Sequence, residues 1–344
     1  MQGINDLTLG QLADALAQIP EAKGFRAKQI IQWVFKGITS FDQMTNISKD
    51  LRQKLSENFC FNYAEIEERF PSQIDGTIKY LLRLTDGNCV EAVLMRYKHG
   101  NTICLSTQVG CYMGCKFCAS TIGGKVRNLT AGEMVSQIFA VQQDIGERIS
   151  NIVLMGIGEP LDNYDNVLAF LHNVNEEMGL NIGYRHISLS TCGLVDGINR
   201  LADEELPITL SVSLHAPTNE IRDKIMPVNK KYPVEQLIAA CKAYIKKTGR
   251  RISFEYILID GVNDTPFAAQ KLAQLLKGML CHVNLIPANE VKETGMKRTP
   301  PQKVRSFQKS LVEKGLTVTV RRELGSDINA SCGQLRKNRM EQKA

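Results

Sequence analysis

From residue 102 onward, short apolar runs alternate with longer amphipathic segments. The runs are rich in β-branched residues and nearly continuous, which is typical of strands buried on both faces. They span residues 102–107, 151–157, 186–191, 208–215, 251–259, 282–288 and 317–324. Apolar residues spaced three and four apart predict helices at residues 131–146, 164–179, 234–249 and 266–279. We therefore expect an α/β fold with a partial or full (βα) barrel, since six or seven units fill about 220 residues.

The first hundred residues follow a different pattern. Residues 5–19 and 25–37 have helical periodicity, and residues 78–97 read as a hairpin with its turn at Asp86-Gly87. The expected organisation is an accessory domain of helices plus a hairpin at residues 1–98, a barrel at 99–325 and a C-terminal segment at 326–344.

Composition is that of a soluble globular protein, with 43% hydrophobic and 23% charged residues in 344. The sequence has no apolar run of about 18 residues and no signal-peptide layout at its N-terminus, so we expect a cytoplasmic protein without membrane contact. Ten cysteines at irregular spacing argue against a disulfide framework and for metal binding or catalysis by a few of them.

Positive charge is concentrated near the C-terminus. The formal charge of the chain is +6, yet residues 297–344 hold twelve Lys and Arg against four Asp and Glu. A second basic run, formed by Lys116, Lys125 and Arg127, flanks three cysteines. The pattern is compatible with a polyanionic partner and equally with solvated helix faces.

The three cysteines Cys111, Cys115 and Cys118 follow the first predicted barrel strand with Cys-x₃-Cys-x₂-Cys spacing. A structural zinc site needs four ligands, so the fourth would have to come from a histidine or from Cys104, Cys192, Cys281 or Cys332. A [4Fe–4S] cluster on three thiolates leaves one iron open to a small molecule. Both interpretations remain open from the spacing.

Polar residues recur where predicted strands end. The second strand runs into Gly156, Gly158 and Glu159, where glycines allow close backbone approach and the carboxylate can accept hydrogen bonds from an ammonium group. Ser190, Ser213, His215 and Asn289 lie near the ends of later strands. Barrel enzymes build their sites on that face, although each residue alone is equally explained as a satisfied loop residue.

Several longer motifs carry a resemblance to one family. They are "STQVGCYMGCKFCAS", "MGIGEPLDN", "LSVSLHAP", "EIRDKIMPVNKKYP", "HVNLIPAN" and "GSDINASCGQL", together with the N-terminal "FRAKQI". With them the chain resembles, over nearly its whole length, the RlmN/Cfr family of radical S-adenosylmethionine (SAM) RNA methyltransferases. The resemblance implies one [4Fe–4S] cluster per chain on Cys111, Cys115 and Cys118. It also implies SAM contacts from Gly158, Glu159, Ser190, Ser213, Leu214, His215 and Asn289.

The same resemblance implies the reaction. The RlmN type methylates carbon 2 of adenine 2503 in 23S rRNA, and often carbon 2 of adenine 37 in a subset of tRNAs, with ping-pong use of two SAM molecules. Carbon 2 is electron-poor and cannot attack a sulfonium methyl group, so a radical route is required. Cys332 matches the family's methyl-accepting cysteine, and Cys104 matches the resolving cysteine that forms a transient disulfide bond with it. Glu91 matches the proton acceptor, whereas strand alternation alone favours a solvent-facing glutamate.

The implied partners are 23S rRNA, tRNA and a reducing protein such as flavodoxin or ferredoxin. The basic C-terminal segment and the helix with Arg26 and Lys28 are the candidates for phosphate contacts. The other cysteines, Cys60, Cys89, Cys192, Cys241 and Cys281, are interpreted as ordinary buried or half-buried thiols.

Three alternatives remain. "GEPL" and "TQVGC" favour the RlmN type over the Cfr type, which methylates carbon 8 of the same adenine. A radical SAM enzyme with another substrate, such as an activating enzyme, needs neither Cys104 nor Cys332. A non-catalytic iron–sulfur or zinc RNA-binding protein would not cleave SAM.

Overall fold

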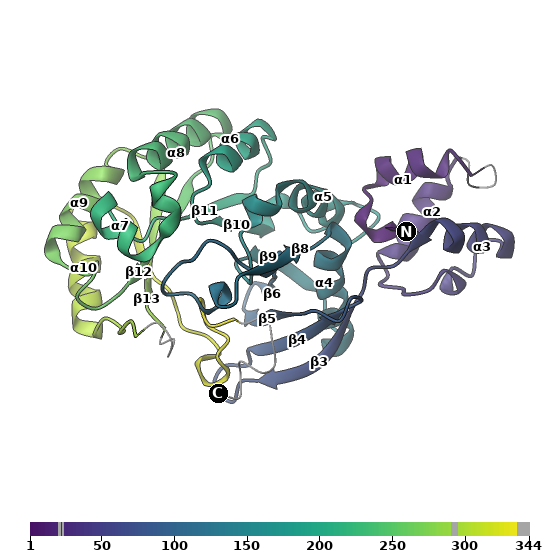
Figure 1. Cartoon of the computed structure of the whole chain (residues 1–344), viewed down its shortest axis with the longest axis horizontal. Helices are drawn as coiled ribbons and strands as arrows, with labels where there is room; N and C mark the ends of the chain where they lie inside the picture. Colours follow the sequence, from purple (N-terminus) through teal and green to yellow (C-terminus); the bar gives the residue numbers. More distant parts are fainter. Residues whose placement is uncertain (20–21, 23, 290–294, 336–344) are drawn as a thin grey trace.

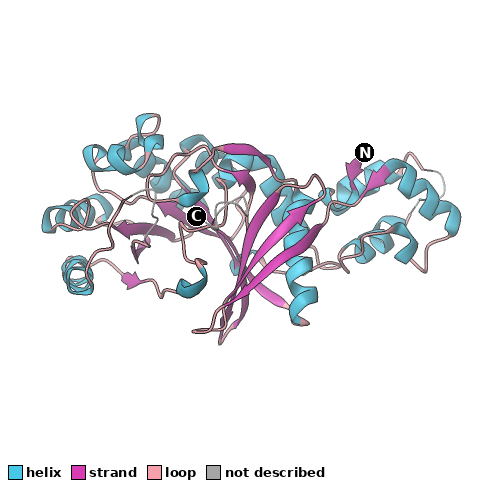
Figure 2. Cartoon of the chain, turned by 60° about the horizontal axis from the view of Figure 1, so that its bottom comes forward, coloured by secondary structure: helices cyan, strands magenta, loops and turns pink. Residues whose placement is uncertain are grey.

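A curved sheet of ten strands forms the centre of the molecule in the computed structural model, which describes residues 1–19, 22, 24–289 and 295–335. Helices cover its outer side, and the N-terminal helices lie at one end (Figures 1 and 2). The order across the sheet is β14-β13-β12-β11-β10-β9-β6-β5-β4-β3. These strands are β3 (Ala64–Pro71), β4 (Ile78–Leu84), β5 (Cys89–Tyr97), β6 (Gly100–Cys104), β9 (Ile149–Leu154), β10 (Ile187–Thr191), β11 (Thr209–Ser213), β12 (Ile252–Leu258), β13 (Cys281–Pro287) and β14 (Val318–Val320).

The strands from β6 to β14 in this sheet are parallel, as the alternating pattern predicted. Among the described residues β14 and β3 are the two edges, so the parallel strands form a partial barrel. All seven predicted strands are confirmed. These strands have apolar residues on both faces because one face lies inside the barrel and the other is buried under helices.

The predicted helices between the strands are also confirmed. They are α4 (Ala131–Ile145), α5 (Tyr164–Asn175), α8 (Val234–Thr248) and α9 (Pro266–Leu276), and the structure adds α6 (Val195–Asp203), α7 (Asn219–Ile225) and α10 (Pro301–Glu313). Helix α4 begins with a capping box between Thr130 and Glu133 and ends at Gly146 in the left-handed conformation. None of the described helices is long and apolar enough to cross a membrane.

The N-terminal region contains α1 (Leu9–Leu16), α2 (Arg26–Val34) and α3 (Lys49–Asn58), with the short pair β1 (Gln2–Gly3) and β2 (Phe59–Cys60). Its contact with the barrel is polar and tight. Asp6 Oδ1 accepts a 2.8 Å hydrogen bond from the Gly132 amide at the start of α4, and a Cβ at Gly132 would lie 2.6 Å from Asn5. The N-terminal helices are therefore fixed against the barrel at this point.

The predicted hairpin is β4 and β5, with β3 added outside it, and β5 pairs directly with barrel strand β6. The hairpin thus continues the barrel sheet without a break in hydrogen bonding. The domain boundaries at residues 98 and 325 stay a prediction.

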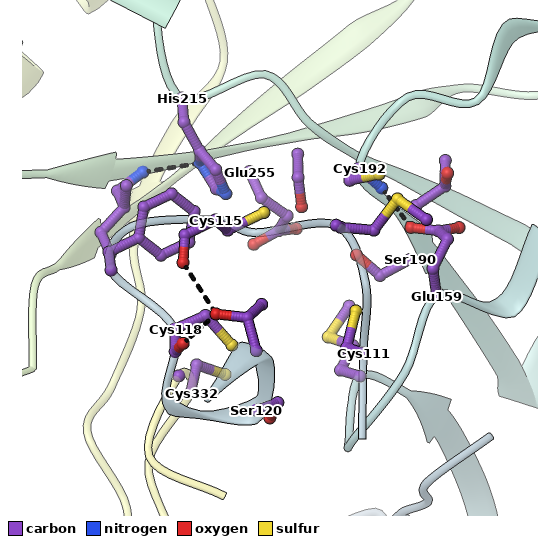
Figure 3. A pocket seen from close by; sticks show the side chains of 18 of the residues that line it. Cys111, Cys115, Cys118, Ser120, Glu159, Ser190, Cys192, His215, Glu255 and Cys332 are labelled. Carbon is purple, nitrogen blue, oxygen red and sulfur yellow. Dashed lines mark hydrogen bonds between the residues drawn. The ribbon is translucent and has the colours of Figure 1, made fainter. Parts of the chain in front are cut away.

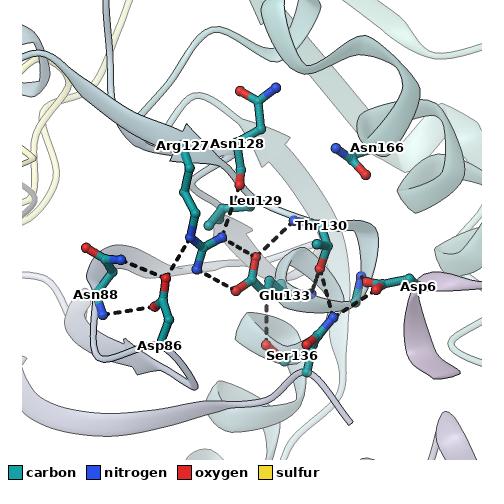
Figure 4. Close-up of polar contacts among 12 residues, drawn as sticks. Asp6, Asp86, Asn88, Arg127, Asn128, Leu129, Thr130, Glu133, Ser136 and Asn166 are labelled. Carbon is teal, nitrogen blue, oxygen red and sulfur yellow. Dashed lines mark hydrogen bonds and ion pairs between the residues drawn. The ribbon is translucent and has the colours of Figure 1, made fainter. Parts of the chain in front are cut away.

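Two residues of the predicted basic run are held by acids of the chain itself. Arg127 contacts Asp86 at 2.7 Å and Glu133 at 2.8 Å (Figure 4), and Lys125 contacts Asp162 at 2.6 Å. These contacts favour the structural interpretation of Lys125 and Arg127. The part of the basic C-terminal segment at residues 336–344 lies outside the described residues.

Candidate active site

A cavity of about 880 Å³, its open mouth included, lies at the carboxyl ends of the parallel strands. The walls combine side chains from the cysteine loop, from strand ends and from the C-terminal segment (Figure 3). They include Cys111, Cys115, Cys118, Gly158, Glu159, Ser190, Ser213, His215, Glu255, Arg321 and Cys332.

The cysteine loop is held by backbone contacts on both sides. It leaves β7 (Gln108–Gly110), which pairs with β8 (Lys125–Asn128), and a Cβ at Gly110 would lie 1.9 Å from the carbonyl oxygen of Gly124. The Lys116 amide donates a 2.9 Å hydrogen bond to the Ile225 carbonyl, and the Thr121 hydroxyl donates to the Cys118 carbonyl at 2.9 Å. The loop is therefore shaped by its own strand pair and by the C-terminal end of α7.

The three loop thiols suit a bound cation. Burial raises the pKa of Cys111 to about 12 and also raises the pKa values of Cys115 and Cys118. The thiols therefore stay neutral unless a metal compensates the thiolate charge, as ligation does. Among the described residues no three or more His, Cys, Asp or Glu side chains converge closely enough to hold a single ion. Three thiol donors along one wall fit an iron–sulfur cluster, whereas a zinc site would need Cys192 or Cys332, which line the same cavity.

The glycine-rich turn after β9 requires its glycines. A Cβ at Gly156 would lie 2.5 Å from the Leu105 carbonyl, and one at Gly158, where φ is 111°, would lie 2.7 Å from Gln108 Cβ. Glu159 is buried and accepts hydrogen bonds from the Leu161 amide at 3.0 Å and the Cys192 amide at 2.7 Å. Burial raises its pKa. Both carboxylate oxygens are thereby fixed at the cavity wall, with lone pairs left for a ligand ammonium group.

His215 adopts a left-handed backbone with φ of 58°, which turns its ring into the cavity (Figure 3). Its Nδ1 accepts a hydrogen bond from the Ile257 amide at 3.0 Å, and the ring packs edge-on against Phe117 at 4.9 Å. Burial lowers the pKa of His215 to about 3, so the ring is neutral and carries its proton on Nε2.

The remaining predicted SAM contacts are distributed over two cavities. Ser190 and Ser213 line the first. Leu214 is fully buried and is not among the residues that line it. Asn289 lines a second cavity and donates a 2.9 Å hydrogen bond to the Cys332 carbonyl.

Cys332 lines both cavities and lies close to the cysteine loop. The next residue, Gly333, accepts a 2.7 Å hydrogen bond from the Ala119 amide, and the Ser120 hydroxyl donates to the Leu335 carbonyl at 2.9 Å. Figure 3 shows the Cys332 side chain beside that of Cys118. The C-terminal segment is thus fastened directly to the loop that carries the three cysteines.

Cys104 is buried at the end of β6, in an apolar cluster with Val93, Met95 and Leu335. Burial raises its pKa to about 12, and negative charge on Cys332 raises it further. Met95 connects the two cysteines, because it packs in the cluster of Cys104 and lines the second cavity with Cys332. All ten cysteines are free thiols in this structure, so the implied Cys104–Cys332 disulfide is not formed here.

The solvent-facing interpretation of Glu91 is wrong. Glu91 is 0% exposed, and its Oε1 lies 3.2 Å from Nζ of Lys79 on the neighbouring strand β4. Strand alternation does direct it away from Val90 and Ala92. That face of β5, however, looks into the barrel, where Leu335 of the C-terminal segment packs on Val93 and Met95. Glu91 is not among the residues that line the first cavity.

Four further residues at the site were not predicted. Glu255 accepts hydrogen bonds from Ser253 at 3.0 Å and Asn284 at 2.8 Å, and burial raises its pKa. Arg321 lies 3.9 Å from Glu255, and a Cys332 thiolate is the largest influence that raises the pKa of Arg321. Cys192, interpreted as an ordinary thiol, lines the cavity, and Arg222 is buried behind it. For Glu255 the sequence did contain a signal, because a charged residue inside the apolar run "RISFEYILI" indicates a buried polar site.

Comparison with known proteins identifies the class first. Residues 105–269, which contain most of the first cavity, match the family model described as "Radical SAM superfamily". The chain is therefore a radical SAM protein, a class that uses SAM and a [4Fe–4S] cluster. Residues 3–61 match the model "Ribosomal RNA large subunit methyltransferase N-terminal domain".

Full-length relatives narrow the assignment. The chain is 53% identical over 339 residues, 98% of each sequence, to "Probable dual-specificity RNA methyltransferase RlmN" of Clostridium novyi (strain NT). It is 57% identical over 335 residues, 97% of each, to the protein of that name from Alkaliphilus oremlandii (strain OhILAs). A crystal structure of a radical SAM methyltransferase from Sphaerobacter thermophilus matches with a TM-score of 0.91 and 43% identity, covering 98% of this chain and 99% of that one. The chain belongs to the RlmN family of radical SAM proteins.

Proposed function

We propose that this protein methylates carbon 2 of adenine 2503 in 23S rRNA, and carbon 2 of adenine 37 in a subset of tRNAs. The observation that carries the proposal is the arrangement of five cysteines, three as candidate cluster ligands and two as candidate reacting thiols. Three lie on one loop, Cys332 lines the same cavity, and Cys104 on β6 packs in one apolar cluster with Leu335 of the C-terminal segment. The names of the full-length relatives, which are called dual-specificity RNA methyltransferases, support the same activity.

Cys111, Cys115 and Cys118 would hold one [4Fe–4S] cluster, and the SAM contacts would come from Gly158, Glu159, Ser190, Ser213, Leu214, His215 and Asn289. When bound, the cluster supplies the electron that cleaves SAM. Glu159 offers fixed carboxylate oxygens for the ammonium group of SAM. The neutral His215 can donate only through Nε2, because Nδ1 is occupied by the Ile257 amide.

Cys332 would accept a methyl group from one SAM, because its sulfur is the nucleophile that adenine carbon 2 cannot be. The second SAM would supply the group that takes a hydrogen atom from that methyl group, and the resulting methylene carbon would then bond to carbon 2 of the base. Arg321 lines both cavities together with Cys332, so a cation lies in the same site as the sulfur that would react.

Release of the RNA would fall to Cys104 and Glu91. Once the radical adduct has given up one electron and the proton of carbon 2, the Cys104 thiolate would attack the Cys332 sulfur. The electron pair of the broken sulfur–carbon bond would stay on the methylene carbon, which takes up a proton to become the new methyl group. The disulfide left behind must be opened by a reductant before the next turnover. Glu91 would accept the proton that leaves carbon 2. Its contact with Lys79 favours the carboxylate form, which is the form that can take up a proton.

The RNA must present an unstacked adenine, since carbon 2 is not accessible within a helix. Tyr112 on the cysteine loop is exposed, and the candidates for phosphate contacts are Arg26 and Lys28 of α2 together with the basic C-terminal segment. Phosphate contacts there predict binding that weakens with salt. A reducing protein such as flavodoxin or ferredoxin would deliver the electron.

Mass spectrometry of nucleosides tests the proposal. Unmodified 23S rRNA fragments and tRNA are incubated with the anaerobically reconstituted protein, SAM and a reductant, then digested and analysed. We expect 2-methyladenosine from both RNAs. The 8-methyl isomer would instead identify a Cfr-type enzyme, and zinc without iron together with intact SAM would identify a non-catalytic RNA-binding protein. Methylated RNA from the Cys332→Ala variant would contradict the role of Cys332.

A further inference from the structure

Arg222 is the largest side chain that is fully buried among the described residues. It lies on α7, and its guanidinium group donates to neutral acceptors only. Nε donates to the Leu214 carbonyl at 3.0 Å, and Nη2 donates to the carbonyls of Cys192 at 2.7 Å and Ser213 at 3.2 Å. Nη1 donates to Asn229 Oδ1 at 3.2 Å and to the Tyr232 carbonyl at 3.5 Å. Every acceptor is a dipole, so the positive charge itself is not cancelled by these bonds.

No carboxylate of the described chain forms an ion pair with Arg222. The nearest acid along the hydrogen bonds is Asp223, which accepts from Asn229 at 2.7 Å and so is one side chain removed. Glu159 accepts a hydrogen bond from the Cys192 amide, whereas Arg222 donates to the Cys192 carbonyl, so the carboxylate and the guanidinium group contact different sides of the same residue. A buried cation without a countercharge is costly, so proteins seldom retain one unless a negative group binds nearby.

The cysteine loop packs directly against the segment that Arg222 anchors. Ile225, one turn later on α7, accepts the hydrogen bond from Lys116. Ile225 and Met226 share an apolar cluster with Cys115 and Cys192, and Met226 lines the first cavity with them. Although burial lowers the pKa of Arg222, negative charges on Cys192 and Cys115 act in the opposite direction. The guanidinium group therefore lies behind the wall where thiolate charge would gather.

We propose that Arg222 is the buried countercharge of the cluster site and makes reduction of the bound cluster easier. The inference rests on the proposed cluster ligands and is independent of the RNA substrate. Three thiolates give the bound cluster a net negative charge, and one electron taken from the reductant makes that charge one unit more negative. A fixed cation behind the loop stabilises the reduced form more than the oxidised form.

A purely structural role is the competing explanation, because the five hydrogen bonds also tie together the ends of β10, β11 and the turn at Pro227–Lys230. The two roles respond differently to substitution. Arg222→Lys keeps the charge and loses most of the hydrogen-bond geometry, whereas Arg222→Met loses both. Asn229 donates to Asp223, so Asn229→Asp is made together with Asp223→Asn, which keeps that hydrogen bond with its direction reversed. This exchange, called Asn229→Asp below, keeps Arg222 and moves the carboxylate to the atom that Nη1 already contacts.

The test is a reductive titration with dithionite of the anaerobically reconstituted protein, followed by electron paramagnetic resonance of the reduced cluster. We expect Arg222→Met to make one-electron reduction about tenfold less favourable, a shift of about 59 mV to more negative potential. Asn229→Asp should shift the potential in the same direction. Arg222→Lys and the control Arg200→Met, an exposed arginine paired with Asp165, should stay close to the unmodified protein.

Iron content per chain and far-UV circular dichroism establish that each variant is folded and loaded. If Arg222→Met does not fold, Asn229→Asp decides alone. An unchanged potential in loaded Asn229→Asp protein would overturn the inference, and so would a shift in Arg222→Lys as large as in Arg222→Met. Absence of an iron–sulfur signal from the unmodified protein would instead defeat the proposed cluster site.

Discussion

Removal of Cys104 should convert the protein into one that traps its RNA. In the proposed reaction the methylene carbon links Cys332 to adenine until a second thiolate attacks the Cys332 sulfur. Cys104 is the buried thiol whose pKa responds to Cys332 and which packs in the same cluster as Leu335. Cys104→Ala should therefore accumulate up to one covalent RNA per chain.

The pKa of Cys104 sets the expected rate of release in the unmodified protein. Burial first, and then the charge of Cys332, raises that pKa to about 12. In the covalent adduct Cys332 is a neutral thioether, so burial alone keeps the pKa of Cys104 raised, and the thiol is mostly protonated near neutral pH. Release should become about tenfold faster for each unit of pH from 7 to 9.

The assay combines denaturing gels with rapid quenching. The covalent species migrates slowly and disappears after ribonuclease treatment, and its decay in the unmodified protein is followed as a function of pH. Cys241→Ala is a matched control, because burial also raises the pKa of Cys241 to about 12 but this thiol lies on α8 in the main core. Turnover by Cys104→Ala without a trapped species, or a release rate independent of pH, would refute the reasoning.

Three further predictions concern neighbouring residues. Lys79→Met removes the cation that lies 3.2 Å from Glu91 in a buried site, so the free energy of unfolding in urea should fall by about 3 to 5 kcal/mol. Adding Glu91→Leu should restore most of that stability. Equal losses in the single and the double variant would contradict this. Gly158→Ala places a Cβ 2.7 Å from Gln108 on a strained backbone, so the affinity for SAM in equilibrium dialysis should fall about tenfold. Gly146→Ala is the control, because its Cβ would have no atom within 4 Å, and it should bind SAM with unchanged affinity. The pKa of His215 is about 3 in the folded protein and 6.5 ordinarily, so between these pH values only the unfolded chain binds the extra proton. The free energy of unfolding should therefore fall by about 1.4 kcal/mol per pH unit as the pH drops below 6.5. Urea unfolding curves of His215→Asn should lack this part of the pH dependence.

Local patterns were sufficient for most of the framework. Strands β6 and β9 to β14 coincide with apolar runs because a buried parallel strand needs apolar residues on both faces. The cysteine spacing and the Gly156-Ile157-Gly158 turn are also local, since the loop and the turn are each built from neighbouring residues. The third N-terminal helix α3 and the edge strand β3 escaped prediction because their exposed faces weaken the apolar period.

Long-range packing decided the rest. Strand alternation correctly separated Glu91 from Val90 and Ala92, but Glu91 is buried, and the face that it shares with Val93 and Met95 packs with Leu335, more than 200 residues later. Lys125 and Arg127 were equally suited to RNA by sequence, and their acid partners come from other elements.

By itself the sequence determined the parallel fold and the three-cysteine loop. Its family resemblance also predicted that Cys104 and Cys332 react with one another. Only the tertiary structure decided that Cys332 joins two cavities, that Glu91 faces Lys79 inside the barrel, and that Arg222 lies uncompensated behind the loop. The physical reason is that periodicity reports which face of an element is apolar, whereas the energy of a buried charge depends on groups brought near it from distant parts of the chain.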